Sequence, residues 1–183
     1  MGGAGSHQTP PEPLVSAHDL SVGYSDEPVC APATFNLLPG QVLALVGVNG
    51  AGKSTLLKIV AGILGGYEGC VTIDGEPVRP AVQRIGFMPQ NYGLLPWKTG
   101  RENIELGIRI RRGEPDAGKV KRLMQRLGIA ELGGRYPHEL SGGQQQRVGL
   151  ARAFLLQPDV LLMDEPFPPW MNCLRDVSPC RPC

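Results

Sequence analysis

Residues 47–54 read GVNGAGKS and match the phosphate-binding pattern G-x-x-x-x-G-K-[ST]. The apolar run QVLALV at residues 41–46 precedes this loop and predicts a short buried strand. A helix is predicted to follow, from Lys53 to about Ile63. Glycines let the loop curl so that several backbone N–H groups point at one anion, and a helix N-terminus adds partial positive charge. We therefore expect this strand–loop–helix unit to bind a chain of phosphates.

The loop supplies two side chains with distinct roles. The Lys53 ammonium is a mobile full charge for the β- and γ-phosphates of a nucleotide, and the Ser54 hydroxyl is a ligand for Mg²⁺. The expected nucleotide contacts are Gly47, Asn49, Gly50, Ala51, Gly52, Lys53, Ser54 and Thr55.

A second polar group follows an apolar run at residues 160–163, which ends in Asp164 and Glu165. In an open α/β sheet, ligands lie at the carboxyl ends of the strands. The pattern predicts Asp164 beside the Mg²⁺ bound by Ser54. It predicts Glu165 where it can polarise a water molecule against the γ-phosphate. Lys53 and Glu165 are therefore candidate catalytic residues.

Residues 140–147 read LSGGQQQR and lie just upstream of the Asp-Glu strand. Ser141 and the two glycines at a predicted helix start form a second candidate anion site. This segment resembles the signature motif of ABC transporter ATPases. The resemblance implies that Ser141, Gly142, Gly143 and Gln144 contact the ATP held by a partner subunit, in a head-to-tail dimer with two ATP molecules between the subunits.

Other family marks appear in the same order along the chain. The resemblance implies that Tyr24 stacks on adenine and that Gln90 contacts Mg²⁺ and the attacking water. It implies a helical subdomain at about residues 91–145 that docks on transmembrane permease subunits, with a solute-binding protein as an indirect partner. The sequence LLPW at residues 94–97 is similar to the nitrate/sulfonate/taurine importer branch.

The implied fold is α/β, a P-loop NTPase of ABC type. It has a mainly parallel sheet core, an N-terminal antiparallel β part and a helical subdomain, with the last strands missing. The expected organisation is a disordered tail at residues 1–13, an incomplete ATPase domain at 14–167 and an aberrant tail at 168–183. The implied function is an ATP-hydrolysing subunit of an importer for a small solute.

Local patterns predict further elements. Strands are expected within residues 14–24 and at residues 69–73 and 85–88, with a type I′ turn at Asp74-Gly75. Capping boxes predict helices starting at Thr99 and at Ser141. A third helix is expected through Val120 and Leu127 and is ended by Gly128.

Composition bounds the function. The chain has 183 residues with a net charge of +1, which gives no support to nucleic-acid binding. No apolar run reaches membrane-spanning length and no secretory signal is visible. We expect a cytoplasmic protein, peripheral on the inner face of the cell membrane.

The resemblance stops after Phe167. The family continues there with Ser-Ala-Leu-Asp, whereas this chain reads PPWMNC at residues 168–173, and none of its 3 histidines lies downstream of Asp164. Codons for residues 168–173, read one nucleotide out of frame, permit Ser-Ala-Leu-Asp-Glu-Leu. We therefore expect a frameshift near codon 167. Since the family uses a downstream histidine in hydrolysis, turnover by this chain is expected to be weak or absent.

Two alternatives to the importer subunit stay open. One is a truncated, non-catalytic ATP-binding fragment, and the other is a soluble ABC ATPase of another class, such as a DNA-repair or translation factor. Near-neutral charge and the LLPW segment oppose the latter.

Overall fold

The computed structural model describes residues 12–21, 23–24, 27–28, 32–111 and 113–165. The chain divides into two compact units, Met1–Gln83 and Arg84–Cys183. The predicted tail at residues 168–183 and nearly all of that at residues 1–13 lie outside the described residues.

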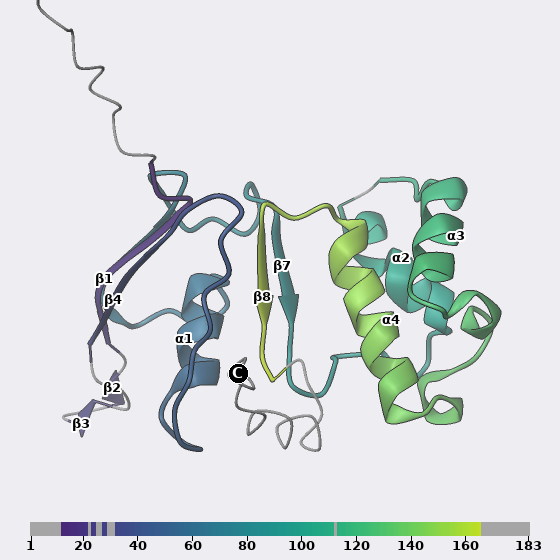
Figure 1. Ribbon diagram of the computed structural model, residues 1–183, viewed down its shortest axis with the longest axis horizontal. Coiled ribbons are helices and arrows are strands. Elements are labelled where there is room, and N and C mark those ends of the chain that lie inside the picture. Colours follow the sequence, from purple (N-terminus) through teal and green to yellow (C-terminus); the bar gives the residue numbers. More distant parts are fainter. Residues whose placement is uncertain (1–11, 22, 25–26, 29–31, 112, 166–183) are drawn as a thin grey trace, which may run out of the picture. The chain divides into compact units, whose positions relative to one another are not determined.

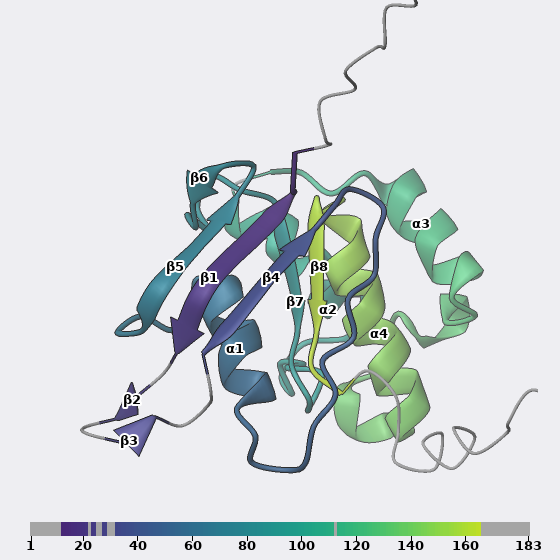
Figure 2. The ribbon, with the colours of Figure 1, turned by 60° about the vertical axis from the view of Figure 1, so that its left-hand side comes forward.

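An antiparallel sheet organises the first unit. Strand β1 (Val15–Ser21) lies between β4 (Ala33–Leu37) and β5 (Glu68–Ile73), and β6 (Glu76–Pro77) pairs with β5 (Figure 2). Val15 and Ala17 of β1 and Val71 and Ile73 of β5 are buried because alternate side chains of a strand point to the same face, and a register shift after Ala17 interrupts the alternation in β1. Asp74 and Gly75 have φ of 52° and 73°, which confirms the predicted tight turn between β5 and β6.

The remaining elements of this unit are small. Strands β2 (Gly23–Tyr24) and β3 (Glu27–Pro28) form a separate pair. Helix α1 (Lys53–Val60) begins at the predicted residue and ends three residues before the predicted Ile63.

The prediction of a buried strand at residues 41–46 is wrong for this structure. These residues are in no strand, and the side chains of Val42 and Val46 are 95% and 76% exposed. A strand requires hydrogen-bonded neighbours, and no described strand pairs with this run. Apolar composition alone therefore did not specify a strand here.

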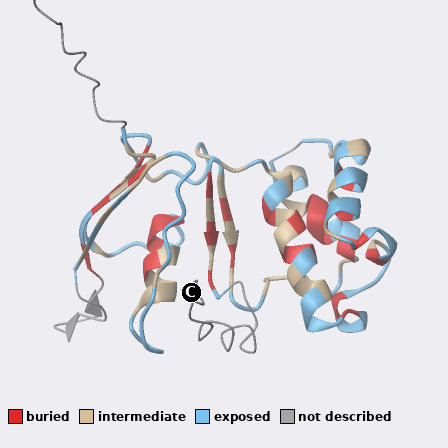
Figure 3. Cartoon of the chain, in the orientation of Figure 1, coloured by how far each residue is buried: buried red, intermediate tan, exposed pale blue. Residues whose placement is uncertain are grey.

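The second unit combines a parallel strand pair with three helices (Figure 1). Strand β7 (Ile85–Met88) pairs in parallel with β8 (Val160–Met163). Both strands have the predicted bounds. The helices are α2 (Gly100–Ile110), α3 (Ala117–Arg126) and α4 (Gly142–Leu155), with the 3₁₀ turns η1 (Ala130–Leu132) and η2 (Pro137–Glu139) between α3 and α4. Their inward faces form one core (Figure 3), which contains Ile104, Val120, Met124, Ile129, Leu132, Leu140, Val148 and Ala151.

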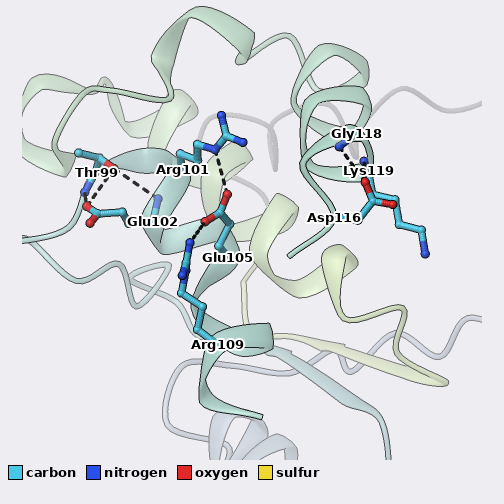
Figure 4. Close-up of polar contacts among 8 residues, drawn as sticks. All are labelled: Thr99, Arg101, Glu102, Glu105, Arg109, Asp116, Gly118 and Lys119. Atoms are coloured by element: carbon cyan, nitrogen blue, oxygen red, sulfur yellow. Dashed lines mark hydrogen bonds and ion pairs between the residues drawn. The ribbon is translucent and has the colours of Figure 1, made fainter. Parts of the chain in front are cut away.

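Polar contacts at the helix starts explain where α2 and α3 begin (Figure 4). Thr99 and Glu102 form the predicted capping box. The pKa of Glu102 is lowered because its carboxylate accepts from the Thr99 backbone N–H and hydroxyl. The Asp116 carboxylate caps α3 by accepting from the N–H groups of Gly118 and Lys119, which lowers its pKa. Each cap satisfies amides that a helix leaves without an internal partner.

An ion-pair triad lies along α2 (Figure 4). The Glu105 carboxylate is buried between Arg101 at 2.9 Å and Arg109 at 2.7 Å. Burial opposes ionisation of Glu105, but the hydrogen bonds from both arginines outweigh it and hold its pKa below the usual range.

None of the helices in the described part of the chain is long and apolar enough to cross a membrane.

Candidate functional site

The phosphate loop lies in the first unit, directly before α1. Gly50 and Gly52 have φ of 84° and 81°, a left-handed conformation that glycine adopts without strain. A Cβ atom at Gly50 would meet nothing within 4 Å, so the backbone there is open to an approaching group. No side chain caps α1 at Gly52, so the first turn of the helix presents its positive end to the loop.

The Lys53 side chain folds back over this loop. Its Nζ donates to the carbonyl oxygens of Gly47 at 2.9 Å and Val48 at 2.7 Å. The ammonium is therefore held among the same residues whose backbone curls around it. A loop of exposed glycines with a central cation and an uncapped helix start fits a phosphate chain.

The second unit brings two other predicted residues together. Gln90 follows β7 and Glu165 follows β8, and the two strands are parallel with Met88 opposite Met163. Parallel pairing places the carboxyl ends of both strands at one edge. Gln90 Nε2 donates to Glu165 Oε2 at 2.6 Å. Gln90 and Glu165 are both exposed, so this pair is accessible to a ligand.

Asp164 stands at the same edge, one residue before Glu165. Its side chain is buried, and its backbone N–H donates to the Met88 carbonyl at 2.9 Å. Gln90 and Asp164 carry oxygen donors of the kind that Mg²⁺ prefers, and so does Ser54 in the first unit. No cluster of three His, Cys, Asp or Glu side chains suited to a metal occurs within the described residues. Nucleotide-bound Mg²⁺ needs only one or two carboxylates, because phosphates and water complete its coordination.

The signature-like segment forms the start of α4. Ser141 is the N-cap residue, and its backbone N–H donates to Gln144 Oε1 at 2.9 Å in the predicted capping box. Gly142 and Gly143 are exposed, and a Cβ at either would meet nothing within 4 Å. The two glycines leave the backbone at the amino end of α4 open, and anion binding there stays a prediction.

The candidate residues are divided between the two units. Tyr24 and residues 47–55 belong to the first, and Gln90, residues 141–144, Asp164 and Glu165 belong to the second. The structure brings Gln90, Asp164 and Glu165 to one sheet edge. The Tyr24 backbone lies in β2, and its side chain is outside the described atoms, so adenine stacking by Tyr24 stays a prediction.

Two residues that hold the segment after Gln90 were missed by sequence reasoning. The Arg152 guanidinium donates to the carbonyl oxygens of Tyr92 and Gly93. The fully buried Asn103 amide bonds with Leu95, Lys98 and Thr99. Polar residues are common in both helix sequences, so neither Asn103 nor Arg152 gave a local signal of its partners.

Residues 30–168 match the family model described as ABC transporter. The sulfate/thiosulfate import ATP-binding protein CysA of Caulobacter vibrioides is 41% identical over 149 residues, covering 76% of this chain and 44% of that protein. A Salmonella typhimurium protein named for 2-aminoethylphosphonate import, PhnT, is 39% identical over 153 residues, covering 80% of this chain and 41% of that protein.

Solved structures agree. A chain described as an ATP binding subunit of an ABC transporter has a TM-score of 0.73 and 29% identity, covering 84% of this chain and 67% of that one. The protein cbiO1 of Clostridium perfringens, part of the ABC transporter complex cbiONQ, has a TM-score of 0.69 and 27% identity, covering 82% of this chain and 64% of that one. The predicted ABC-type P-loop fold is confirmed.

The same comparisons correct one prediction. The relatives are named for sulfate/thiosulfate and 2-aminoethylphosphonate import, so the assignment to the nitrate/sulfonate/taurine branch is wrong. The LLPW segment misled because four residues in one loop do not determine a subfamily. The chain spans less than half the length of these curated relatives.

Proposed function

Because this chain belongs to the ABC transporter family, we propose that it is the ATP-binding subunit of an ABC importer and binds ATP with Mg²⁺. The observation that carries the proposal is the Gln90–Glu165 hydrogen bond at the carboxyl ends of two parallel strands. A carboxylate and an amide at this place suit the orientation of a water molecule for phosphoryl transfer. The glycine loop with Lys53 at its centre supports phosphate binding.

Each residue has a definite chemical task in this proposal. Lys53 and the backbone of residues 47–55 would bind the phosphates, and Ser54, Gln90 and Asp164 would hold Mg²⁺, which when bound would supply positive charge against the β- and γ-phosphates. Glu165 accepts a hydrogen bond from the attacking water and aligns it in line with the leaving oxygen. Gln90 donates to the Glu165 carboxylate and keeps it in place.

The proposal extends to an assembly. The start of α4 would close on the γ-phosphate held by a second ATPase subunit, giving a head-to-tail dimer. Closure of that dimer would move the permease subunits between two states, and the permease would receive solute from a binding protein. The chain would then act as a peripheral subunit on the cytoplasmic face of the membrane, with Tyr24 against the adenine. The names of its relatives support a small oxyanion as the imported solute.

The residues after Phe167 carry a separate proposal. A single missing nucleotide near codon 167 would account for a tail whose codons permit Ser-Ala-Leu-Asp-Glu-Leu in the neighbouring frame. Sequencing of the coding DNA across this region tests it directly. An additional nucleotide, or codons that permit the second frame, supports the proposal. Codons for residues 168–173 that cannot encode that hexapeptide contradict it.

Release of radiolabelled phosphate tests the role of Glu165. We expect slow release by the 183-residue chain, and Glu165→Gln should reduce it by about a hundredfold or more while ATP binding is retained, since general-base groups contribute about 10²–10⁴-fold. Glu131→Gln is the matched control, because Glu131 is exposed in η1. Measurable release that is equal in wild type and Glu165→Gln would exclude Glu165 as the catalytic base. ATP binding without measurable release by wild type would favour the non-catalytic fragment.

A further inference from the structure

The residues that carry Gln90 form a tight turn. The Tyr92 N–H donates to the Pro89 carbonyl at 2.9 Å, so the turn closes around Gln90. Tyr92 and Gly93 both have positive φ, 60° and 57°. A non-glycine residue such as Tyr92 adopts this conformation at a cost and persists there only when its surroundings hold it.

Arg152 on α4 supplies that hold. One Nη donates to the Gly93 carbonyl at 2.6 Å and the other donates to the Tyr92 carbonyl at 2.6 Å. The planar guanidinium is suited to such a two-point contact, which a lysine ammonium cannot reproduce. Within the described residues Arg152 forms no ion pair with a carboxylate. Burial lowers the pKa of Arg152, and the two carbonyls are what compensate for its desolvation.

The backbone of α4 is close to the same turn. A Cβ atom at Gly149, one helical turn before Arg152, would lie 3.2 Å from Tyr92 Cβ and 3.4 Å from Tyr92 O. A Cβ at Gly93 would lie 3.2 Å from an Arg152 Nη atom. Both glycines therefore permit the approach that brings the guanidinium to its carbonyls. We refer to Gly149 and Arg152, together with Tyr92 and Gly93, as the turn latch.

We propose that Arg152 is a positioning residue for Gln90: by holding the Tyr92 and Gly93 carbonyls, it orients the amide that bonds Glu165 and would bind Mg²⁺. This inference rests on the proposed function, in which Gln90 and Glu165 face the nucleotide. In this proposal Arg152 acts through Gln90 and is not itself a ligand of ATP or metal. It also joins the turn to the helix whose other end begins at Ser141, so one rigid element carries both the latch and the second anion site.

Binding measurements on the 183-residue chain test the latch with Arg152→Met and Arg152→Lys. Two affinities are compared by titration with a fluorescent ATP analogue: nucleotide without metal, and Mg²⁺ for the nucleotide-bound chain. Loss of a residue that orients a metal ligand typically costs about 10–100-fold in metal affinity, so Arg152→Met should weaken Mg²⁺ binding by about tenfold or more. Arg152→Lys should recover part of this loss. Metal-free nucleotide affinity should change by less than about twofold, because in this proposal the phosphate loop binds the nucleotide and Arg152 acts only on the Tyr92 and Gly93 carbonyls.

Two controls separate positioning from folding. Arg126→Met removes an exposed arginine from α3 and should leave both affinities unchanged. In a Gln90→Ala background, Arg152→Lys should cause no further loss of Mg²⁺ affinity, since the group it positions is absent. Parallel loss of both affinities in Arg152→Lys, or unchanged Mg²⁺ affinity in both Arg152 variants, would overturn the proposal.

Hydrogen exchange at the Tyr92 amide gives a readout that needs no ligand. The Tyr92 N–H is bonded to Pro89 O, so release of the latch should speed its exchange by about tenfold or more, as expected when a local hydrogen bond opens more easily. Exchange at wild-type rate in Arg152→Met contradicts the latch. A wild-type chain that binds neither nucleotide nor Mg²⁺ would refute the proposed function. Hydrogen exchange at the Tyr92 amide would still show whether Arg152 holds the turn.

Discussion

Asn103 of α2 holds the segment after Gln90 through its side-chain amide, and replacement by aspartate removes the donor group of that amide. Asn103 is fully buried, and its Nδ2 donates to the carbonyls of Leu95, Lys98 and Thr99 at 3.1, 2.9 and 3.0 Å. Its Oδ1 accepts from the Leu95 N–H at 2.7 Å. Asn103→Asp keeps the acceptor oxygen and the shape of the side chain. It replaces the NH₂ group that faces three carbonyl oxygens with a negatively charged oxygen.

The magnitude follows from these contacts. The Thr99 carbonyl keeps a second donor in the Asn103 backbone N–H, whereas the Leu95 and Lys98 carbonyls face the substituted group. A partly or fully buried polar group left without its partner costs about 1–3 kcal/mol, and a charged group at the fully buried Asn103 position costs more. We expect Asn103→Asp to lower the free energy of unfolding by about 3 kcal/mol or more at neutral pH. Burial raises the pKa of the introduced carboxyl in the folded state, so on acidification this carboxyl is protonated at a higher pH in the folded than in the unfolded chain. The loss of unfolding free energy relative to wild type should therefore become smaller as the pH is lowered from neutral toward the acid range.

Urea unfolding followed by far-ultraviolet circular dichroism measures the effect. Asn91→Asp is the matched control, since Asn91 is exposed in the same loop and uses its oxygen to accept from the Gly93 N–H, a role that a carboxylate keeps. That control should change stability by less than about 0.5 kcal/mol. If Asn103→Asp unfolds at the same urea concentration as Asn91→Asp, the Asn103 hydrogen bonds do not stabilise the loop as argued.

Three further predictions concern helix α2, the sheet and helix α3. Glu105→Gln removes a carboxylate whose pKa is lowered by its two arginines. The stabilisation from this carboxylate is present above the unfolded pKa of about 4.3 and is lost as pH falls through the folded pKa. The melting temperatures of wild type and Glu105→Gln should therefore converge in acid, and a difference that stays constant with pH would contradict this. Gly69→Ala places a Cβ against the His18 and Asp19 carbonyls at φ 85° and should destabilise the sheet by more than about 1 kcal/mol, whereas Gly65→Ala, with open space around it, should be nearly neutral in the same urea titration. Asp116→Ala removes the α3 cap and should cost about 1 kcal/mol, and an unchanged unfolding midpoint would show that the cap is not needed.

Local patterns predicted the helices of the second unit well. The capping boxes at Thr99 and Ser141 involve residues three apart, so the stabilising contacts are contained in the pattern itself. The Asp74-Gly75 turn was predictable for the same reason, because its two residues determine its backbone conformation.

Features that depend on distant partners were not predictable. The run at residues 41–46 has the composition of a strand, but strand formation requires a neighbour that no local pattern specifies. Arg152 bonds carbonyls 59 and 60 residues away, so its role depends on tertiary packing. The motifs indicated that Gln90 and Glu165 are candidates, whereas their 2.6 Å contact follows from the parallel register of β7 and β8.

Calorimetric titration of the 183-residue chain with ATP and Mg²⁺ tests the central claim most directly. Wild type and Lys58→Met, which alters an exposed lysine of α1, should bind with equal affinity. Lys53→Met should bind at least about tenfold more weakly, because a charge-assisted hydrogen bond contributes about 1.5–3 kcal/mol. Absence of binding by wild type, or equal affinity of Lys53→Met and Lys58→Met, would contradict the assignment of the phosphate loop.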